Sequence, residues 1–240
     1  MNSASIKVYN SVDLFKILMS VAVVAIHTNP IVYCTNEFAI RVTVMIEDWA
    51  VPFFFVASGF FLWNSHEKHI DQYIKKIIRL YCVWTLVSLP LAIYGYAISE
   101  NTWISCILSY IKYFFFVGKL YNSYHLWYLL ALIYALFVIR IMKKKNINIW
   151  IILSFSAVVY FIAQILQLGM NHLEDIPYFM SKIVQVYQYV FNKGDVFTGF
   201  LFVSIGMLLA EYHPKINIWI LLIGTMGLGI LSMFSSEFMK

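Results

Sequence analysis

The chain has 240 residues, of which 62% are hydrophobic and only 12% are charged. A soluble domain has about 45–50% apolar and about 25% charged residues, so this composition excludes an ordinary soluble domain. The net charge of +5 does not indicate nucleic-acid binding, because the basic residues form short clusters between apolar stretches, as they do in membrane proteins.

Apolar stretches follow one another along the chain, and most approach the roughly 20 residues that cross about 30 Å of hydrocarbon as a helix. They predict an all-α fold, a polytopic transmembrane helical bundle, because only helices satisfy the backbone in lipid without closing a barrel. The chain, residues 1–240, is predicted to be a single membrane domain. The seven predicted spans are residues 12–29, 46–63, 80–98, 125–142, 149–168, 196–211 and 217–236.

Two basic clusters set the expected orientation. One lies within residues 64–79 and the other within residues 140–145. Lysine and arginine concentrate on the cytoplasmic side, so both clusters and the N-terminus are expected in the cytoplasm. Residues 64–79 are predicted to form an interfacial helix that leads into the third span. The shorter apolar stretch 103–117 is predicted to be re-entrant or interfacial, because a full crossing there would place the clusters on opposite sides.

Ionisable residues within predicted spans are costly in lipid and are therefore functional candidates. Lys16 and His27 are eleven residues apart in the first span. That spacing is about three helical turns, so both point to similar sides, about 16 Å apart along the helix. Pattern alone equally allows His27 to cap the helix end while Lys16 reaches lipid phosphates. Asp13 is interpreted as an N-terminal helix charge or a partner for one of these bases.

His125 begins the fourth span and, in this orientation, lies at the same membrane face as His27. Imidazole titrates near neutral pH, so the two histidines are candidates for a proton-transfer site. Trp127 and the neighbouring tyrosines equally indicate an aromatic belt at the interface. Arg79 ends the first basic cluster and suits donor phosphates or anionic lipid headgroups. The three cysteines form no C-x-x-C pair, and no metal site is predicted.

Four motifs, in chain order, resemble those of the acyltransferase-3 family of integral membrane acyltransferases. They are Val12-Asp13-Leu14-Phe15-Lys16 followed by His27, then VPFFFVASGF at 51–60, KKIIRLY at 75–81 and HLWYL at 125–129. Residues 199–206 are a weaker match. Lys16 stands where the family usually has arginine, so it keeps the charge but not the planar fork. The resemblance covers residues 12–130 best and the remainder loosely.

The resemblance implies transfer of an acyl group, commonly acetyl, from cytoplasmic acyl-CoA to a hydroxyl of an outer-facing glycan or cell-envelope acceptor. It implies that His27 is the general base and that His125 is a second proton-handling group. Lys16 and Arg79 would contact the donor, with Asp13 and Trp127 also at the substrate site. The expected partners are the lipid bilayer of the cell membrane, acyl-CoA and the acceptor, with no tightly bound cofactor and no nucleic acid. Family members usually have more helices, so the chain is expected to lack the last ones.

The chain is also similar to the membrane half of the membrane-bound serine racemases of glycopeptide-resistance systems, where this half is associated with serine uptake. A second function therefore stays open, transport or binding of a small polar solute such as serine without acyl chemistry. A truncated, inactive relative is the third hypothesis. The two histidines favour the acyltransferase, and the short length favours the inactive relative. The acyl group, the acceptor and the oligomeric state do not follow from the sequence.

Overall fold

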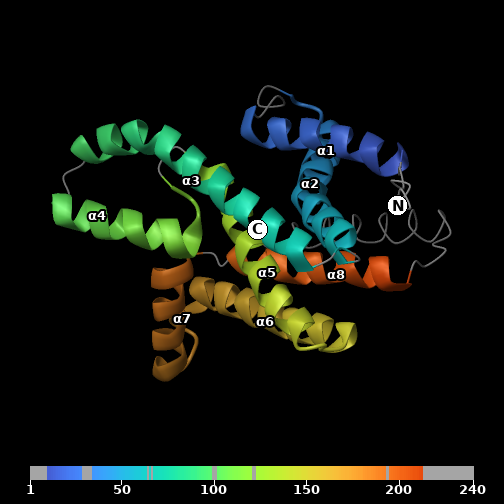
Figure 1. Cartoon of the computed structure of the whole chain (residues 1–240). Helices are drawn as coiled ribbons and strands as arrows, with labels where there is room; N and C mark the ends of the chain where they lie inside the picture. The colour runs from blue at the N-terminus through green and yellow to red at the C-terminus, as the bar shows by residue number, and fades with distance from the viewer. Residues whose placement is uncertain are drawn as a thin grey trace. The chain divides into compact units, whose positions relative to one another are not determined.

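The computed structural model describes residues 10–28, 34–63, 65, 67–98, 102–120, 123–192 and 195–212, which are helical almost throughout (Figure 1). The α-helices in this part of the chain are α1 (Asn10–Thr28), α2 (Glu37–Trp63), α3 (Glu67–Ala97), α4 (Trp103–Lys112), α5 (Trp127–Lys144), α6 (Ile149–Gly169), α7 (Tyr178–Phe191) and α8 (Thr198–Tyr212). The short helices are η1 (Tyr113–Val117), η2 (Tyr124–Leu126), η3 (Met170–His172) and η4 (Asp195–Phe197). No β-strand occurs among these residues, which confirms the predicted all-α fold.

Within the described residues, four helical stretches are long and apolar enough to cross a membrane. They are Glu37–Trp63, Glu67–Ala97, Tyr124–Lys144 and Ile149–His172, and each contains or overlaps a predicted span. Trp103–Val117 and Thr198–Tyr212 are shorter apolar helices. The predicted span 217–236 lies outside the described residues, and the count of seven spans stays a prediction.

Two helices differ from the predicted boundaries at their N-terminal ends. α2 begins at Glu37 rather than at residue 46. α3 is one unbroken helix of 31 residues, which joins the predicted interfacial segment 64–79 to the predicted span 80–98. A helix of this length measures about 46 Å, whereas the hydrocarbon layer is about 30 Å thick. The charged first turns of α3 therefore extend beyond the apolar layer.

Helix α7 was not predicted. Its 14 residues bury Ser181, Val184 and Tyr187 along one side, while the exposed residues include Lys182 together with apolar side chains such as Val186. A helix of 14 residues is too short to register as a span, which needs about 20. The stretch between the fifth and sixth predicted spans is consequently a packed helix rather than a simple connection.

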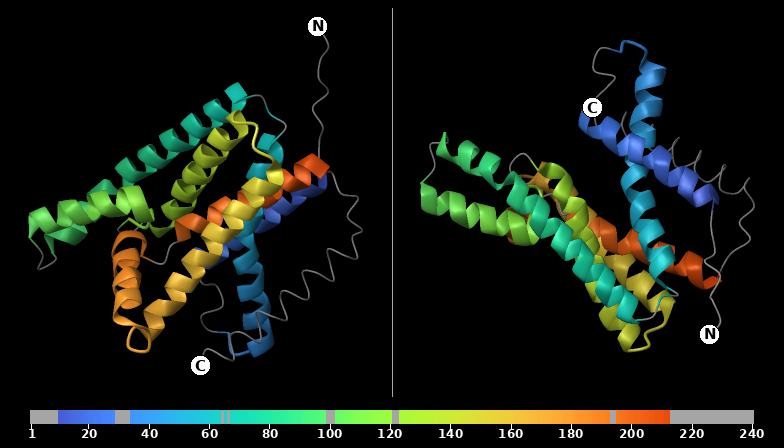
Figure 2. Two further views of the ribbon diagram at one scale, coloured as in Figure 1. Left: turned by 90° about the horizontal axis from the view of Figure 1, so that it is seen from below. Right: turned by 45° about the horizontal axis from the view of Figure 1, so that its top comes forward.

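The chain forms two units. The first contains α1 and the part of α2 up to Phe54, and in it the rings of Phe15 and Phe53 lie 6.3 Å apart. The second runs from Phe55 to Tyr212. In the second unit α5 packs against both α3 and α8, and α8 also packs against α6 (Figure 2). Leu132 and Leu136 of α5 are almost completely buried in this core.

Two glycines allow α2 and α8 to approach closely within the second unit. A Cβ added to Gly59 would lie 2.0 Å from the carbonyl oxygen of Val203. A Cβ added to Gly206 would lie 2.0 Å from the carbonyl oxygen of Val56. Small residues allow helix backbones to come together in lipid, where a hydrophobic driving force between helices is absent. The two backbones therefore touch directly at a reciprocal glycine contact.

Candidate functional site

A partly buried ion pair joins the start of α3 to the end of α5. Arg140 donates from Nε to Asp71 Oδ1 at 2.7 Å and from Nη2 to Asp71 Oδ2 at 3.0 Å. The same Nη2 lies 3.2 Å from Glu67 Oε2. This planar fork is the geometry in which arginine binds a carboxylate most strongly. Asp71 lies in the turns of α3 that extend beyond the apolar layer, and the hydrogen bond from Arg140 holds the pKa of its carboxyl below the ordinary value.

A second set of contacts joins the ends of α2 and α8 to the same end of α5. Lys143 donates hydrogen bonds to the backbone carbonyls of Trp63 and Ser65, and its ammonium lies 4.8 Å from the centroid of the Trp63 ring. The indole N–H of Trp63 in turn donates to the carboxylate of Glu211. Together with the ion pair, these contacts hold the start of α3 and the ends of α2, α5 and α8 next to one another in the second unit.

Beside this ion pair, a groove of about 800 Å³ lies between α3 and α5. We call it the basic groove, because four cationic side chains and one carboxylate line it. Among the described residues, Lys75, Lys144 and Lys145 make no salt bridge, whereas Arg140 is held by Asp71. The residues that line the basic groove are Asp71, Ile74, Lys75, Ile78, Phe137, Arg140, Ile141, Lys144 and Lys145.

The basic groove combines charge with an apolar surface. Ile74, Ile78, Phe137 and Ile141 contribute the apolar part of its lining. Lysine ammonium groups bind phosphate as point charges, and an apolar floor accommodates the body of an organic ligand. The groove also brings the two predicted basic clusters to one end of the bundle, which supports their placement on one side of the membrane. Its chemistry suits a phosphorylated organic anion.

Arg79, a predicted donor contact, does not line this groove. It lies one turn beyond Lys75 on α3 and is exposed. Residues four apart on a helix share a face, so Arg79 extends the cationic surface of the groove along α3.

His125 and Trp127 lie at the opposite end of α5. His125 is exposed on η2, next to Leu126, which is only 1% exposed and packs in a cluster with Tyr81. The ring of Trp127 lies 6.2 Å from that of Phe55. From Trp127 to Arg140 the helix rises about 20 Å, so the predicted outer-face residues and the basic groove are separated by most of a membrane thickness.

The remaining predicted site residues belong to the first unit. Asp13 and Lys16 form an i,i+3 ion pair of 3.0 Å, which confirms that Asp13 partners a base. His27 lies in the last turn of α1 and is exposed. His125 belongs to the second unit, so the pairing of His27 with His125 stays a prediction.

A π-helical turn, η1, lies against the middle of α3 and of α5. Its Phe114 carbonyl accepts a hydrogen bond of 2.7 Å from the Tyr81 hydroxyl, and its Phe115 carbonyl accepts one of 2.5 Å from the Tyr134 hydroxyl. Gly118 ends the turn with a φ of 73°. Single π-turns often occur at functional sites, and here two phenols from α3 and α5 hold one in place.

The groove lysines were the functional candidates that the sequence analysis missed. Lys144 and Lys145 entered the prediction only through the orientation of the chain, and Lys75 through the orientation and the KKIIRLY motif. Two signals point to the site, the i,i+4 spacing of Asp71 and Lys75 and the presence of Arg140 at the end of an apolar stretch. An arginine at such a position requires a partner.

The chain matches the model of the acyltransferase-3 family, an acyltransferase domain, over residues 9–238. It is 33% identical over 141 residues to an amino-acid racemase of Enterococcus faecalis, which covers 57% of this chain and 19% of that protein. It is 34% identical over 132 residues to a serine/alanine racemase of Enterococcus gallinarum, with 51% and 18% covered. A further amino-acid racemase of Enterococcus faecalis is 27% identical over 222 residues, or 87% of this chain and 30% of that protein. The matches thus span less than a third of these relatives, and no solved structure matches the chain.

Proposed function

Because the chain belongs to the acyltransferase-3 family, we propose that it is a membrane acyltransferase whose donor is cytoplasmic acyl-CoA. In this proposal the acyl group, acetyl in the simplest case, passes to a hydroxyl of an outer-facing glycan or another cell-envelope acceptor. Membership supports acyl transfer in general, and the apolar helices support a place in the membrane. The observation that favours this donor is the basic groove.

Coenzyme A has the chemistry that this groove suits. Its nucleotide part carries several phosphates, and its thiol ends a long, flexible arm. In the proposal, Lys75, Lys144 and Lys145 bind the phosphates, while Phe137 and its apolar neighbours contact the organic part. Arg79 adds charge beside the groove. The arm extends along the bundle and carries the thioester toward the outer-face residues.

The transfer step assigns His27 as general base. His27 takes the proton of the acceptor hydroxyl while the oxygen attacks the thioester carbonyl. The carbon–sulfur bond then breaks, and the thiolate of coenzyme A leaves with the proton returned from the imidazolium. Lys16, held by Asp13 and about three turns of α1 away from His27, contacts the phosphates of the donor instead. His125 is the second proton-handling group, and Trp127 contacts the acceptor.

Acyl transfer from radiolabelled acetyl-CoA in vesicles tests the two parts of the proposal separately. The Lys144→Ala/Lys145→Ala variant should raise KM for acetyl-CoA about tenfold at unchanged kcat, since each exposed charge contact contributes about 0.5–1 kcal/mol. His27→Ala should lower kcat about a hundredfold or more at similar KM. Lys182→Ala on α7, outside the groove, is the matched control. An unchanged KM in the double variant would exclude the basic groove as the donor site. Full turnover in His27→Ala would exclude His27 as the general base.

The names of the relatives favour one other function. They are racemases of amino acids, and one is named for serine and alanine. The alternative proposal is a membrane module that binds or transports a small amino acid such as serine, with no acyl chemistry. Uptake of radiolabelled serine by the same vesicles, in the absence of acetyl transfer, would replace the first proposal with this one.

A further inference from the structure

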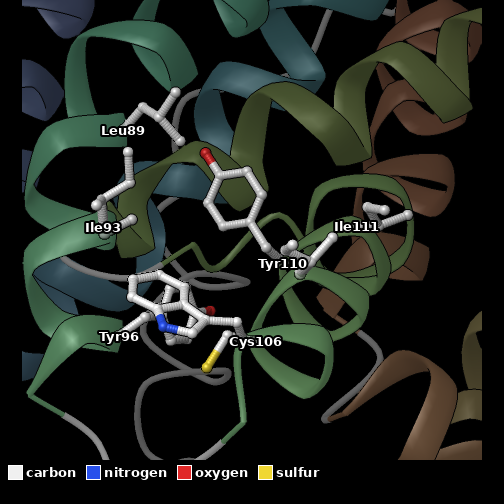
Figure 3. Close-up of a pocket in the computed structure, with 9 residues that line it drawn as sticks. Leu89, Ile93, Tyr96, Cys106, Tyr110 and Ile111 are labelled. Carbon is white, nitrogen blue, oxygen red and sulfur yellow. The ribbon is translucent and has the colours of Figure 1, made fainter.

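An apolar pocket of about 150 Å³ lies between the C-terminal half of α3 and helix α4 (Figure 3). We call it the α3–α4 pocket, and its lining includes Ala92, Ile93 and Tyr96 of α3 with Cys106 and Tyr110 of α4. A cavity of about 150 Å³ lined by apolar side chains stays dry and accepts benzene. The pocket therefore has room for about six carbon atoms.

One hydroxyl in this apolar wall has no partner. The Tyr110 oxygen is out of contact with solvent, and no described residue forms a hydrogen bond with it. Figure 3 shows Tyr110 extending from α4 toward Leu89 and Ile93 of α3. The Tyr96 ring meets the Tyr110 ring at 83°, with centroids 6.4 Å apart, and so limits the orientation of the phenol. An unsatisfied buried hydroxyl is unfavourable, and a ligand with an acceptor oxygen would satisfy it.

The mouth of the pocket is rimmed by exposed apolar side chains, which are typical of a surface that faces lipid. The rim residues Ile93, Trp103 and Ile107 are 50%, 59% and 57% exposed, and α3 is one of the helices apolar enough to cross the membrane. Trp103 and the two pocket tyrosines are amphipathic aromatic residues, which concentrate at the membrane interface. The ester carbonyls of phospholipids lie at that same depth. A ligand that reaches the pocket therefore arrives from the bilayer.

We propose that the α3–α4 pocket binds the acyl chain of a membrane lipid and that Tyr110 donates a hydrogen bond to its ester carbonyl. The methylenes next to the ester occupy the apolar cavity, and the rest of the chain continues past the exposed rim of α4 into the bilayer. The site involves no covalent step and does not depend on acyl-transfer activity. It gives α4, which is too short to span the membrane, a fixed lipid contact at the interface.

Labelling of Cys106 measures entry into this pocket. Cys106 is 4% exposed and lines the cavity, so a small apolar reagent such as methyl methanethiosulfonate labels it by entering the pocket. Replacing Cys34 and Cys82 by alanine leaves Cys106 as the single thiol of the chain. The labelling rate in detergent, followed by mass spectrometry, is then compared with methyl pentanoate or octane added at equal mole fraction.

We expect the ester to protect Cys106 about fivefold more strongly than the alkane, as one additional hydrogen bond implies. Tyr110→Phe keeps the volume of the side chain and should make the two compounds equal. Tyr94→Phe, a tyrosine of α3 outside the pocket, should retain the difference. Equal protection by both compounds with Tyr110 present would overturn the bond to the carbonyl, and protection by neither would overturn the pocket as a binding site.

A photoreactive phosphatidylcholine, with a diazirine close to the ester, tests the same site in vesicles. Crosslinks are expected on α4 and the facing part of α3, and Ala92→Leu, which fills the cavity, should reduce them several-fold. Ala92 is 2% exposed, so thermal unfolding must first show that this variant folds; Ile107→Trp at the rim is the substitute if it does not. Crosslinks spread evenly over α4 and α6, or unchanged by filling the pocket, would overturn the proposal.

Discussion

Replacing Gly59 by alanine tests the close contact of α2 with α8. The added methyl would lie 2.0 Å from the Val203 carbonyl oxygen, whereas ordinary contact begins at 3.4 Å, and this oxygen is backbone and has no alternative rotamer. The helices must separate by roughly 1.4 Å, an overpacking that costs about 1–3 kcal/mol, here at the upper end. Alanine recovers about 1 kcal/mol of helix propensity. The net loss is about 2 kcal/mol, or about 4–8 °C in Tm for a chain of this size.

Thermal unfolding in detergent, followed by intrinsic tryptophan fluorescence, measures this loss. Gly169→Ala is the matched control, because its methyl would meet a Val184 side-chain methyl at 3.1 Å, which has room to adjust. Gly206→Ala should cost as much as Gly59→Ala, because its Cβ meets the Val56 carbonyl at the same distance. One separation of the helices relieves both clashes, so the double variant should lose clearly less than the sum of the two. A Tm within 1–2 °C of the parent for Gly59→Ala, or strictly additive losses, would refute the reciprocal backbone contact.

Three further outcomes follow from the described contacts. Tyr81→Phe leaves the Phe114 carbonyl without its donor and should cost about 1 kcal/mol, seen as a lower Tm than in Tyr94→Phe on the exposed side of α3. Arg140→Lys keeps the charge but not the fork to Asp71, so unfolding should occur at lower temperature; an unchanged Tm would show that the fork contributes nothing. The pKa of Asp71 is lowered in the folded chain, so its stabilisation is complete above the ordinary value of 3.8 and is lost as the pH falls through the lower folded value. Asp71→Asn should flatten the pH dependence of Tm below 3.8, and an identical slope in parent and variant would contradict this assignment.

The helices that hydropathy predicts well are those that are apolar over their whole length. α6 begins and ends within a residue of its predicted span, because lipid and protein core both select apolar side chains along it. α7 escaped prediction because its burial depends on neighbours in the second unit rather than on an apolar run. The full length of α3 could not be predicted for a different reason. Charged residues suggested a separate surface helix, although nothing in residues 67–80 breaks helical continuity.

The site shows the same division. Lys16 with Asp13 could be predicted from spacing alone, since residues three apart on a helix are neighbours. The basic groove could not, because it requires that the first turns of α3 lie beside the last turns of α5. Sequence reasoning had placed both basic clusters on one side of the membrane, but charge counting does not say that two helix ends share a groove. The distance between charged residues is set by packing, which follows from the complete fold.

The π-turn η1 has a consequence for the history of this chain. A π-turn holds one residue more than an α-turn, so residues 113–117 are equivalent to a single-residue insertion into the helix that begins at Trp103. In a relative without that residue the helix would stay in α-helical register. Its own backbone N–H groups would then donate to the carbonyls that Phe114 and Phe115 present here. The hydroxyls of Tyr81 and Tyr134 would then have lost the acceptors they bind here. In an alignment of the family, a gap within 113–117 should therefore coincide with the loss of tyrosine at positions 81 and 134.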